Sequence, residues 1–470
     1  MFPAGIRRAS AMTHEPTAAP ISRDVESILR GHPYRAIMRL AWPATASMLF
    51  ETLFAVVDMI WVGRLGPTPL AAVISATFVV WIMMSLSSVL TTGLVAVVAR
   101  AIGASDLNRA RAVTEETWRL VFLFGVIITV AVIGLRHQII AVMQLEPEVT
   151  RLAEQYLLVY FAGSVIIVFF QWAGALYRAC GNTRTPLLVF SISTVVNIVL
   201  DPLLIFGIGP FPEWGTVGAA AATVASYAVA SVVFIILLRR QRLPFRVGYA
   251  IIGPMSWPRI GRLLSIGLPI SVSGITFSVV YLFVNQVASR FGTESVAALG
   301  IGNRIESIDY LVSYGFALAV ATLVGQNLGA GNPARAASLA HKTLLLVTGF
   351  TGMMTAIYLL FPGPLLHVFS DDPTVITAGV SYVRILALSQ ILMGWEIVLE
   401  GAFSGAGDTL PPMIVSIVGS IGRIPLAWAL AVWLDWGIVG VWWTITISSI
   451  VKGSVLYVWF GLGRWKLRTV

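Results

Sequence analysis

The chain has 470 residues, of which 57% are hydrophobic and only 11% are charged, and its formal net charge at pH 7 is +9. Soluble globular proteins carry about a quarter charged residues, so this composition excludes them and indicates a protein embedded in a lipid bilayer. The basic excess does not indicate nucleic-acid binding, because Arg and Lys fall mainly at the ends of apolar segments, as membrane topology requires.

Apolar segments long enough to span a bilayer recur along the chain and predict an all-α polytopic membrane protein without a soluble domain. The alternating pattern of an outer-membrane barrel is absent. We expect twelve transmembrane helices near residues 38–62, 70–101, 118–140, 153–179, 186–208, 216–239, 264–289, 297–325, 341–362, 376–404, 412–434 and 438–461.

These helices divide into two lobes of six. The expected segments are a cytoplasmic tail (1–35), an N-lobe (36–240), a cytoplasmic linker (241–262), a C-lobe (263–462) and a second cytoplasmic tail (463–470).

The second half of the chain repeats the first without a gap over long stretches. Pro43 corresponds to Pro269, and at the same offset Gly103-Ala104 corresponds to Gly329-Ala330 and Arg109 to Arg335. Many secondary transporters are built from such repeats, because two similar halves can rock around a central site. Each half has an even number of spans, so the two lobes share one orientation and are related by an axis along the membrane normal.

Cations set the predicted orientation. Arg and Lys follow the even-numbered spans, among them Arg178 and Arg184 after the fourth, whereas loops after odd-numbered spans are poorer in cations and often acidic. The positive-inside rule therefore predicts that both termini are cytoplasmic. Arg64 and Arg290 lie on the outer side against this trend.

Polar residues inside the N-lobe spans are the first functional candidates, because ionisable groups in hydrocarbon are costly and usually face a bundle interior or cavity. Glu51 and Asp58 lie two turns apart on one face of the first span. Asn197 and Asp201 are neighbours on the fifth span, and Pro202 follows them. Carboxylates, an amide and loosened backbone oxygens suit H⁺ or a small hard cation such as Na⁺ at Asp58, Asn197 and Asp201. The alternative is a structural cluster that holds the helices together.

The two halves differ in chemistry at these positions. At the constant offset Asp58 corresponds to Val284 and Asp201 to Ala427, so ion coupling is expected in the N-lobe. The C-lobe has its own polar residues in its spans, which could bind a cationic substrate or form internal ion pairs or a gate between the lobes; they are Arg304, Glu306, Asp309, Glu396 and Glu400.

Several aromatic and sulfur-containing side chains are candidates for an apolar cavity, although core filling is the favoured role for any single one: Phe50, Phe54, Phe170, Tyr281 and Met393. No Walker motif, no hydrolase signature and no metal-ligand spacing of Cys180 or the five histidines occurs. The sequence therefore predicts no enzyme, no cofactor and no ATP-driven pump, which leaves an ion gradient as the energy source.

The chain resembles the multidrug and toxic compound extrusion (MATE) family over nearly its whole length after the first tail. The motifs that carry the resemblance are Val57-Asp58-Met59-Ile60-Trp61-Val62-Gly63-Arg64-Leu65-Gly66, Gly181-Asn182-Thr183-Arg184-Thr185-Pro186, Asn197-Ile198-Val199-Leu200-Asp201-Pro202, Val217-Gly218-Ala219-Ala220-Ala221-Ala222-Thr223 and Val324-Gly325-Gln326-Asn327-Leu328-Gly329-Ala330-Gly331. The resemblance implies two six-helix lobes around a central cavity, and efflux of bulky cationic or amphipathic organic compounds by alternating access, in exchange for H⁺ or Na⁺.

The resemblance also implies site residues. The cation site of the family's first lobe carries over to Asp58, Asn197, Asp201 and Thr223, and Glu51 falls where the family often has a polar cavity residue. One branch places acidic sodium-site residues in the seventh and tenth spans, where this chain has Phe277 and about Met393. This departure favours the branch grouped with DNA-damage-inducible (DinF-like) proteins.

The leading hypothesis is a monomeric multidrug antiporter in the inner membrane of a bacterium, whose partners are small organic cations or amphipathic drugs and the lipid bilayer. A flippase for lipid-linked oligosaccharides or lipids is the alternative, but its cavity should be broadly basic to accommodate pyrophosphate, whereas acids are prominent in the N-lobe. A passive channel is disfavoured by the two lobes, and an intramembrane enzyme by the lack of a nucleophile–base pair.

Overall fold

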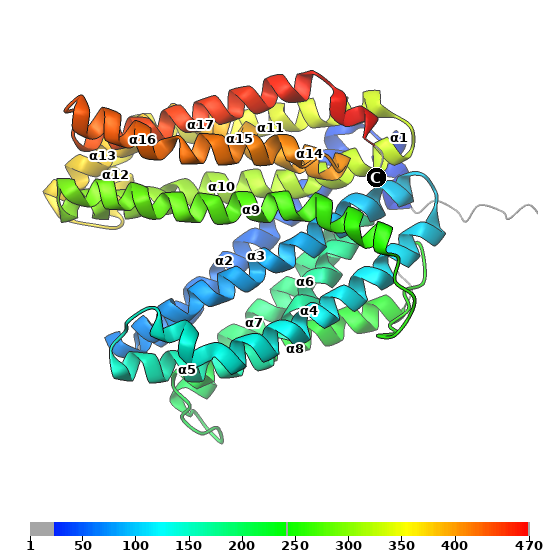
Figure 1. The fold of residues 1–470 in the computed structure, drawn as a ribbon, viewed down its shortest axis with the longest axis horizontal. Coiled ribbons are helices and arrows are strands. Elements are labelled where there is room, and N and C mark those ends of the chain that lie inside the picture. The colour runs from blue at the N-terminus through cyan, green and yellow to red at the C-terminus, as the bar shows by residue number, and fades with distance from the viewer. Residues whose placement is uncertain (1–22, 241–242, 469–470) are drawn as a thin grey trace, which may run out of the picture.

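The computed structural model describes residues 23–240 and 243–468, and within these ranges the chain is helical without a β-strand. Two lobes diverge from the end at which both termini of the described chain lie (Figure 1). We call this the closed end, and the opposite end the open end. The N-lobe comprises α2 to α8 and the C-lobe comprises α9 to α17. The two-lobed, all-α fold predicted from the sequence is confirmed.

The N-lobe contains α2 (Pro33–Gly63), α3 (Pro67–Gly103), α4 (Leu107–Ala141), α5 (Pro147–Ala162), α6 (Ser164–Ala179), α7 (Arg184–Phe206) and α8 (Thr216–Arg239), and is preceded by the short α1 (Arg23–Arg30). The C-lobe contains α9 (Trp257–Ala288), η1 (Ser289–Phe291), α10 (Thr293–Gly329), α11 (Pro333–Leu360), α12 (Pro362–His367), α13 (Pro373–Ala387), α14 (Gln390–Ala406), α15 (Leu410–Ile421), α16 (Arg423–Trp428), the π-helix η2 (Ala429–Trp433), α17 (Ile438–Gly461) and η3 (Arg464–Leu467).

Ten helical segments of the described chain are long and apolar enough to cross a membrane, and two bent pairs bring the number to as many as twelve. The fourth and tenth predicted spans are these bent pairs, α5–α6 at 53° and α13–α14 at 57°. Sequence periodicity does not show such bends, because both arms of each pair are apolar. At the first bend, Gly163 lies so close to the Val224 side chain that a Cβ would clash with it.

Other boundaries also differ from those expected. Helix α4 starts at Leu107, so its first turns extend beyond the predicted third span. Helix α9 starts at Trp257, which makes the end of the expected linker helical. Helix α7 runs through Pro202 to Phe206 without a break. Of the expected tails, residues 1–22 and 469–470 lie outside the described chain.

The first helix of each lobe begins against the opposite lobe. Ala36, Ile37, Leu40 and Ala41 of α2 are buried in a C-lobe cluster, whereas Phe54 further along α2 belongs to the N-lobe core. In the corresponding helix α9, Leu263 and Ile266 are buried in the N-lobe core, and Val280 and Val284 belong to a C-lobe cluster. Each lobe thus packs around the first turns of the other lobe's first helix. The two contacts are related by the repeat seen in the sequence.

At the closed end the backbones of the two lobes approach closely. A Cβ on Gly267 (α9) would clash with the carbonyl oxygen of Val89 (α3), and one on Gly93 (α3) would lie 2.5 Å from that of Leu263 (α9). Side chains add hydrogen bonds across this contact: Ser271 Oγ donates to Ser85 O at 2.7 Å, and Gln326 Nε2 donates to Ala179 O at 2.9 Å. Small residues permit such helix contacts, which van der Waals packing stabilises in lipid.

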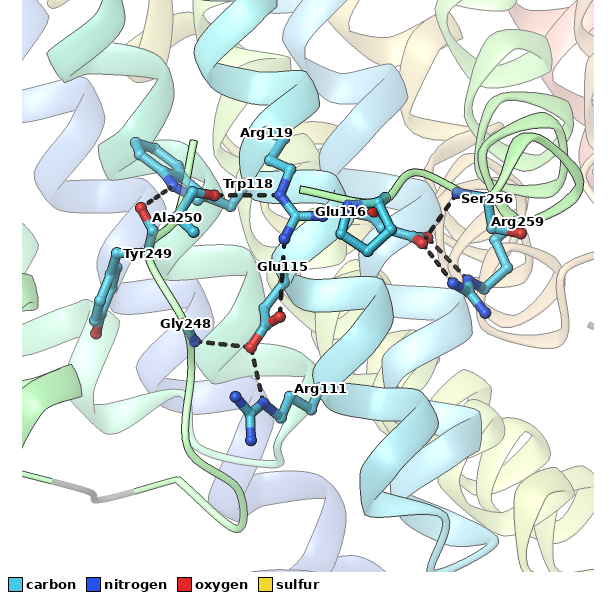
Figure 2. A network of polar contacts seen from close by, with 11 residues as sticks. Arg111, Glu115, Glu116, Trp118, Arg119, Gly248, Tyr249, Ala250, Ser256 and Arg259 are labelled. Carbon is cyan, nitrogen blue, oxygen red and sulfur yellow. Dashed lines mark hydrogen bonds and ion pairs between the residues drawn. The ribbon is translucent and has the colours of Figure 1, made fainter. Parts of the chain in front are cut away.

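The linker between the lobes is strapped to the start of α4 (Figure 2). Arg119 donates to the carbonyl oxygens of Ala250 and Pro254, at 3.2 and 2.6 Å. The buried Glu116 on α4 accepts from Ser256 N at 3.1 Å and forms an ion pair with Arg259 on α9. Because Arg259 belongs to the first helix of the C-lobe, this ion pair connects the two lobes directly.

Helix α1 lies across both lobes at the closed end. Val25 is buried with the N-lobe core, and Ile28, one turn later on the same face, is buried with a C-lobe cluster. Arg335 of α11 donates to Ile28 O at 3.2 Å and to Gly31 O at 2.5 Å, which satisfies carbonyl groups that the helix end leaves free.

Candidate functional site

A pocket with a cavity volume of about 210 Å³ lies between the N-lobe and α10. Its wall comes from α2, α3, α6, α7, α8 and α10. The polar part of the lining consists of Glu51, Ser47, Ser87, Ser88, Thr91, Gln171 and Arg178, and the apolar and aromatic part of Met48, Met84, Phe170, Gly174, Pro186, Phe190, Phe234, Tyr314 and Leu318. An apolar pocket with a few converging polar groups is the usual form of a small-molecule site.

Two of the six residues predicted for the cavity, Glu51 and Phe170, line this pocket. The others lie elsewhere. Phe54 is buried in the N-lobe core and Phe50 packs against that core. Tyr281 donates a hydrogen bond to Asn303 Oδ1 at 2.7 Å inside the C-lobe, and Met393 is half-buried on α14.

The N-lobe carboxyl groups lie deeper, in the interior of the lobe. Asp58 on α2, Asn197 and Asp201 on α7 and Thr223 on α8 are all buried. Asn197 Nδ2 donates to Asp201 Oδ1 at 2.9 Å, and the carboxyl groups of Asp58 and Asp201 are close enough to interact electrostatically. We call Asp58, Asn197 and Asp201 the carboxyl cluster.

Three oxygen atoms of the carboxyl cluster are buried without a hydrogen-bond partner: Asp58 Oδ1, Asn197 Oδ1 and Asp201 Oδ2. Buried polar atoms are normally satisfied, and leaving them unpaired costs free energy. A proton or a hard cation would satisfy them, since oxygen atoms are the ligands that hard cations prefer. With only two carboxyl groups, the cluster is not a site of three or more His, Cys, Asp or Glu residues, and the described chain contains no such group that could hold a metal ion.

Tyrosines that were not predicted from the sequence surround the cluster. Tyr156 and Tyr160 on α5 and Tyr227 on α8 are buried and interact electrostatically with Asp58. Tyr227 also joins the cluster to the pocket, because its ring contacts that of the pocket residue Phe170, with centroids 5.0 Å apart. A ligand in the pocket and a cation at the cluster would therefore share one aromatic wall.

The C-lobe polar residues form a separate network. Lys452 Nζ of α17 pairs with Glu396 Oε1 of α14 at 2.7 Å, and both side chains are buried. Glu400 interacts with the same pair, and Glu306 interacts with Arg423 and Lys452. Arg423 in turn donates to Ser448 and Ser449, at 2.5 and 3.2 Å. Asp309 is buried with both carboxyl oxygens unpartnered, whereas Arg304 is exposed and lies outside the network.

Sequence reasoning missed two cations of these sites. Lys452 is a lone charge in the last apolar span, and its position alone is a signal of function or pairing. Arg178 was counted among the loop cations that set the orientation, but it occupies the last turn of α6 and lines the pocket.

Comparison with known proteins places the chain in a family. The profile of the MatE family matches it twice, over residues 43–203 and 269–429, so both matches begin at the prolines that relate the two halves. A "Probable multidrug resistance protein NorM" of Thermotoga maritima is 30% identical over 439 residues, which cover 93% of this chain and 94% of the relative. An "FAD transporter" of Shewanella oneidensis is 25% identical over 93% of this chain and 96% of its own.

A solved structure, described as the outward-facing conformation of a multidrug resistance MATE family transporter, has a TM-score of 0.87 and 27% identity. The likeness covers 95% of this chain and 99% of that one. The fold, the duplicated profile match and the relatives agree, and the chain belongs to the MatE family of membrane transporters.

Proposed function

We propose that this transporter is a multidrug exporter that expels bulky organic compounds in exchange for H⁺ or Na⁺. The single observation that carries the proposal is the carboxyl cluster, whose unpartnered oxygens are buried next to the aromatic wall of the pocket. The names of the relatives support export of drugs, since a probable multidrug resistance protein resembles the chain over 93% of its length. A broadly basic cavity, as a flippase for lipid pyrophosphates would need, is not what the pocket offers.

The positive-inside rule supports a cytoplasmic closed end and an open end that faces outward. The closed end carries Arg100, Arg109, Arg111 and Arg335, together with the described end of the C-terminal segment. Contacts between small residues hold the closed end together, and the lobes diverge toward the open end (Figure 1), which supports an outward-open state within an alternating-access cycle. A cation would reach the carboxyl cluster from outside in this state.

In the proposed cycle, cation binding at the carboxyl cluster weakens drug binding in the pocket, because the contacting rings of Tyr227 and Phe170 connect the two sites. Binding of H⁺ or Na⁺ at Asp58 and Asp201 removes the repulsion between the carboxylates and lets α2 and α7 pack closer. The movement is transmitted to the pocket through Tyr227 and Phe170 and releases the drug. One elementary charge that crosses a potential of 100 mV supplies about 2.3 kcal/mol, which is enough to drive export.

The test is export of a fluorescent organic cation from proteoliposomes, with H⁺ and Na⁺ gradients applied separately. We expect one of the two gradients to drive export, and Asp58→Asn to abolish it. Glu146→Gln, which changes an exposed acid outside the cluster, is the matched control and should export normally. Full gradient-driven export by Asp58→Asn would overturn the proposal.

A further inference from the structure

The pocket contains two opposite charges that are not paired with each other. Glu51 on α2 is exposed to the pocket, and Arg178 on α6 lines the same wall. They are close enough to interact electrostatically, yet the ion pairs of the described residues do not include one between them. The Arg178 Nε atom is buried and has no hydrogen-bond partner.

Hydrogen bonds from α10 fix the end of the helix from which the Arg178 side chain projects. Thr322 Oγ1 donates to the carbonyl oxygen of Arg178 at 3.0 Å, and Gln326 donates to that of Ala179, so α10 fixes the end of α6. The guanidinium group lies back along α6, where its Nη1 atom would be 3.4 Å from a Cβ on Gly174. Gly174 also lines the pocket and thus leaves room for it.

Aromatic rings complete the pocket around the two charges. Phe170 and Phe190 are in contact, with ring centroids 5.0 Å apart, and Tyr314 lines the wall formed by α10. A pocket with Glu51 alone would select cations. With Arg178 beside it, a purely cationic ligand leaves the guanidinium group unpaired and a purely anionic ligand leaves the carboxylate unpaired. Unpaired charges in a desolvated site are penalised.

We propose that Glu51 and Arg178 form a dipolar recognition site for zwitterionic aromatic compounds, in which Glu51 receives the cationic group and Arg178 the carboxylate. The proposal rests on the proposed function, because it names the class of compound that the exporter prefers. The lining supports it, since no ion pair of the described chain joins the two charged groups and most of the other lining residues are apolar or aromatic.

Three xanthene dyes of similar size provide the test: rhodamine B, a zwitterion; its ethyl ester, a cation; and fluorescein, an anion. Their equilibrium binding to the purified full-length protein is measured by fluorescence anisotropy. We expect rhodamine B to bind on the order of tenfold or more tightly than either of the other two, since a site built for a polar group rejects an analogue that lacks it. Arg178→Gln should abolish the preference over the ester, and Glu51→Gln the preference over fluorescein.

Arg178→Lys keeps the charge and should retain part of the preference, which distinguishes recognition from a folding role of Arg178. Equal binding of all three dyes to the native protein would overturn the proposal, as would a loss of binding in Arg178→Gln that is the same for every dye. Binding does not require a gradient. If the dyes bind as expected but no gradient drives their export, the proposed exporter function fails while the recognition site stands.

Discussion

Gly103 at the end of α3 and Gly329 at the end of α10 hold each other's helices in a reciprocal contact. A Cβ on Gly103 would clash with the carbonyl oxygen of Gln326, and one on Gly329 with that of Arg100. Arg100 and Gln326 are themselves equivalent positions of the repeat, so the contact lies on the pseudo-two-fold axis. The close approach of α3 and α10 at this end therefore requires glycine at both positions, because any side chain there would clash with the opposite backbone.

Gly103→Ala should force α3 and α10 apart and shift the equilibrium away from the outward-open state. The measurement is the distance between spin labels at Val142 and Val368, exposed residues that directly follow α4 and α12, whose last turns lie at the open end of opposite lobes (Figure 1). We expect the population with the longest distances to fall, and transport to fall with it. Gly349→Ala is the control, because nothing lies near its Cβ position, and it should be neutral or stabilising by up to about 1 kcal/mol. Identical distance distributions in both variants would contradict the prediction.

Asn197→Ala removes the hydrogen bond to Asp201 and leaves another buried carboxylate oxygen without a partner. We expect a loss of stability of about 1–3 kcal/mol and a clear loss of gradient-driven export. Thermal unfolding in detergent and proteoliposome transport measure the two effects. Ser191→Ala on the same helix is the control, since the Ser191 hydroxyl donates its hydrogen bond to Leu187 O within that helix. Normal export by Asn197→Ala would remove Asn197 from the coupling site.

Lys452→Met should destabilise the C-lobe by about 3–5 kcal/mol, because it leaves Glu396 buried and uncompensated. Replacing both partners, Lys452→Met with Glu396→Leu, should restore most of the stability, since buried ion pairs often add little net stability. Thermal unfolding of the purified variants measures this. Arg304→Gln, which removes an exposed charge on α10, is the control. If the double variant is as unstable as the single one, the pair has a role beyond mutual compensation.

Glu116→Gln weakens the ion pair with Arg259 and should weaken the attachment of the linker to α4. We expect faster tryptic cleavage at Arg246 in the linker, and slower transport if this attachment transmits motion between the lobes. The charge swap Glu116→Arg with Arg259→Glu should recover part of the protection. Arg151→Gln serves as the control, because its ion pair with Glu148 is exposed and lies within α5, where such pairs contribute little. An unchanged cleavage rate in Glu116→Gln would show that the hydrogen bonds from Arg119 to the linker carbonyl groups hold the linker without help from the ion pair.

The repeat was the part of the fold that the sequence predicted best. A constant offset relates Pro43 to Pro269 and Gly103 to Gly329, and such an offset indicates two similar halves. The bends near Gly163 and Ser389 were not predicted, since helix periodicity continues on both sides of each break. The four-residue spacing of Asn197 and Asp201 placed them on one face, and their hydrogen bond follows from that spacing. Their approach to Asp58 depends on how α2 and α7 pack.

Residues from different helices were the least predictable part of the sites. Nothing in the sequence pairs Lys452 with Glu396, although a single lysine in an apolar span should have been expected to have a partner. Arg178 looked like a loop cation because it stands next to Cys180 and Gly181, where the helix ends. Its place at the pocket wall depends on the packing of α6 against α10, which the hydrogen bond from Thr322 to the Arg178 carbonyl oxygen fixes. The DinF-like branch, the monomeric state and the coupling ion stay predictions.

Helix α1 has a consequence for how the molecule can be handled. Its two buried side chains, Val25 and Ile28, belong to different lobes, and Arg335 clamps the carbonyl end of the same short helix. Any rearrangement that parts the lobes at this end must first detach one anchor. A bulky fusion partner placed directly before Arg23 would therefore slow the transport cycle. The same fusion after residue 468 would leave the contacts of Val25 and Ile28 unchanged.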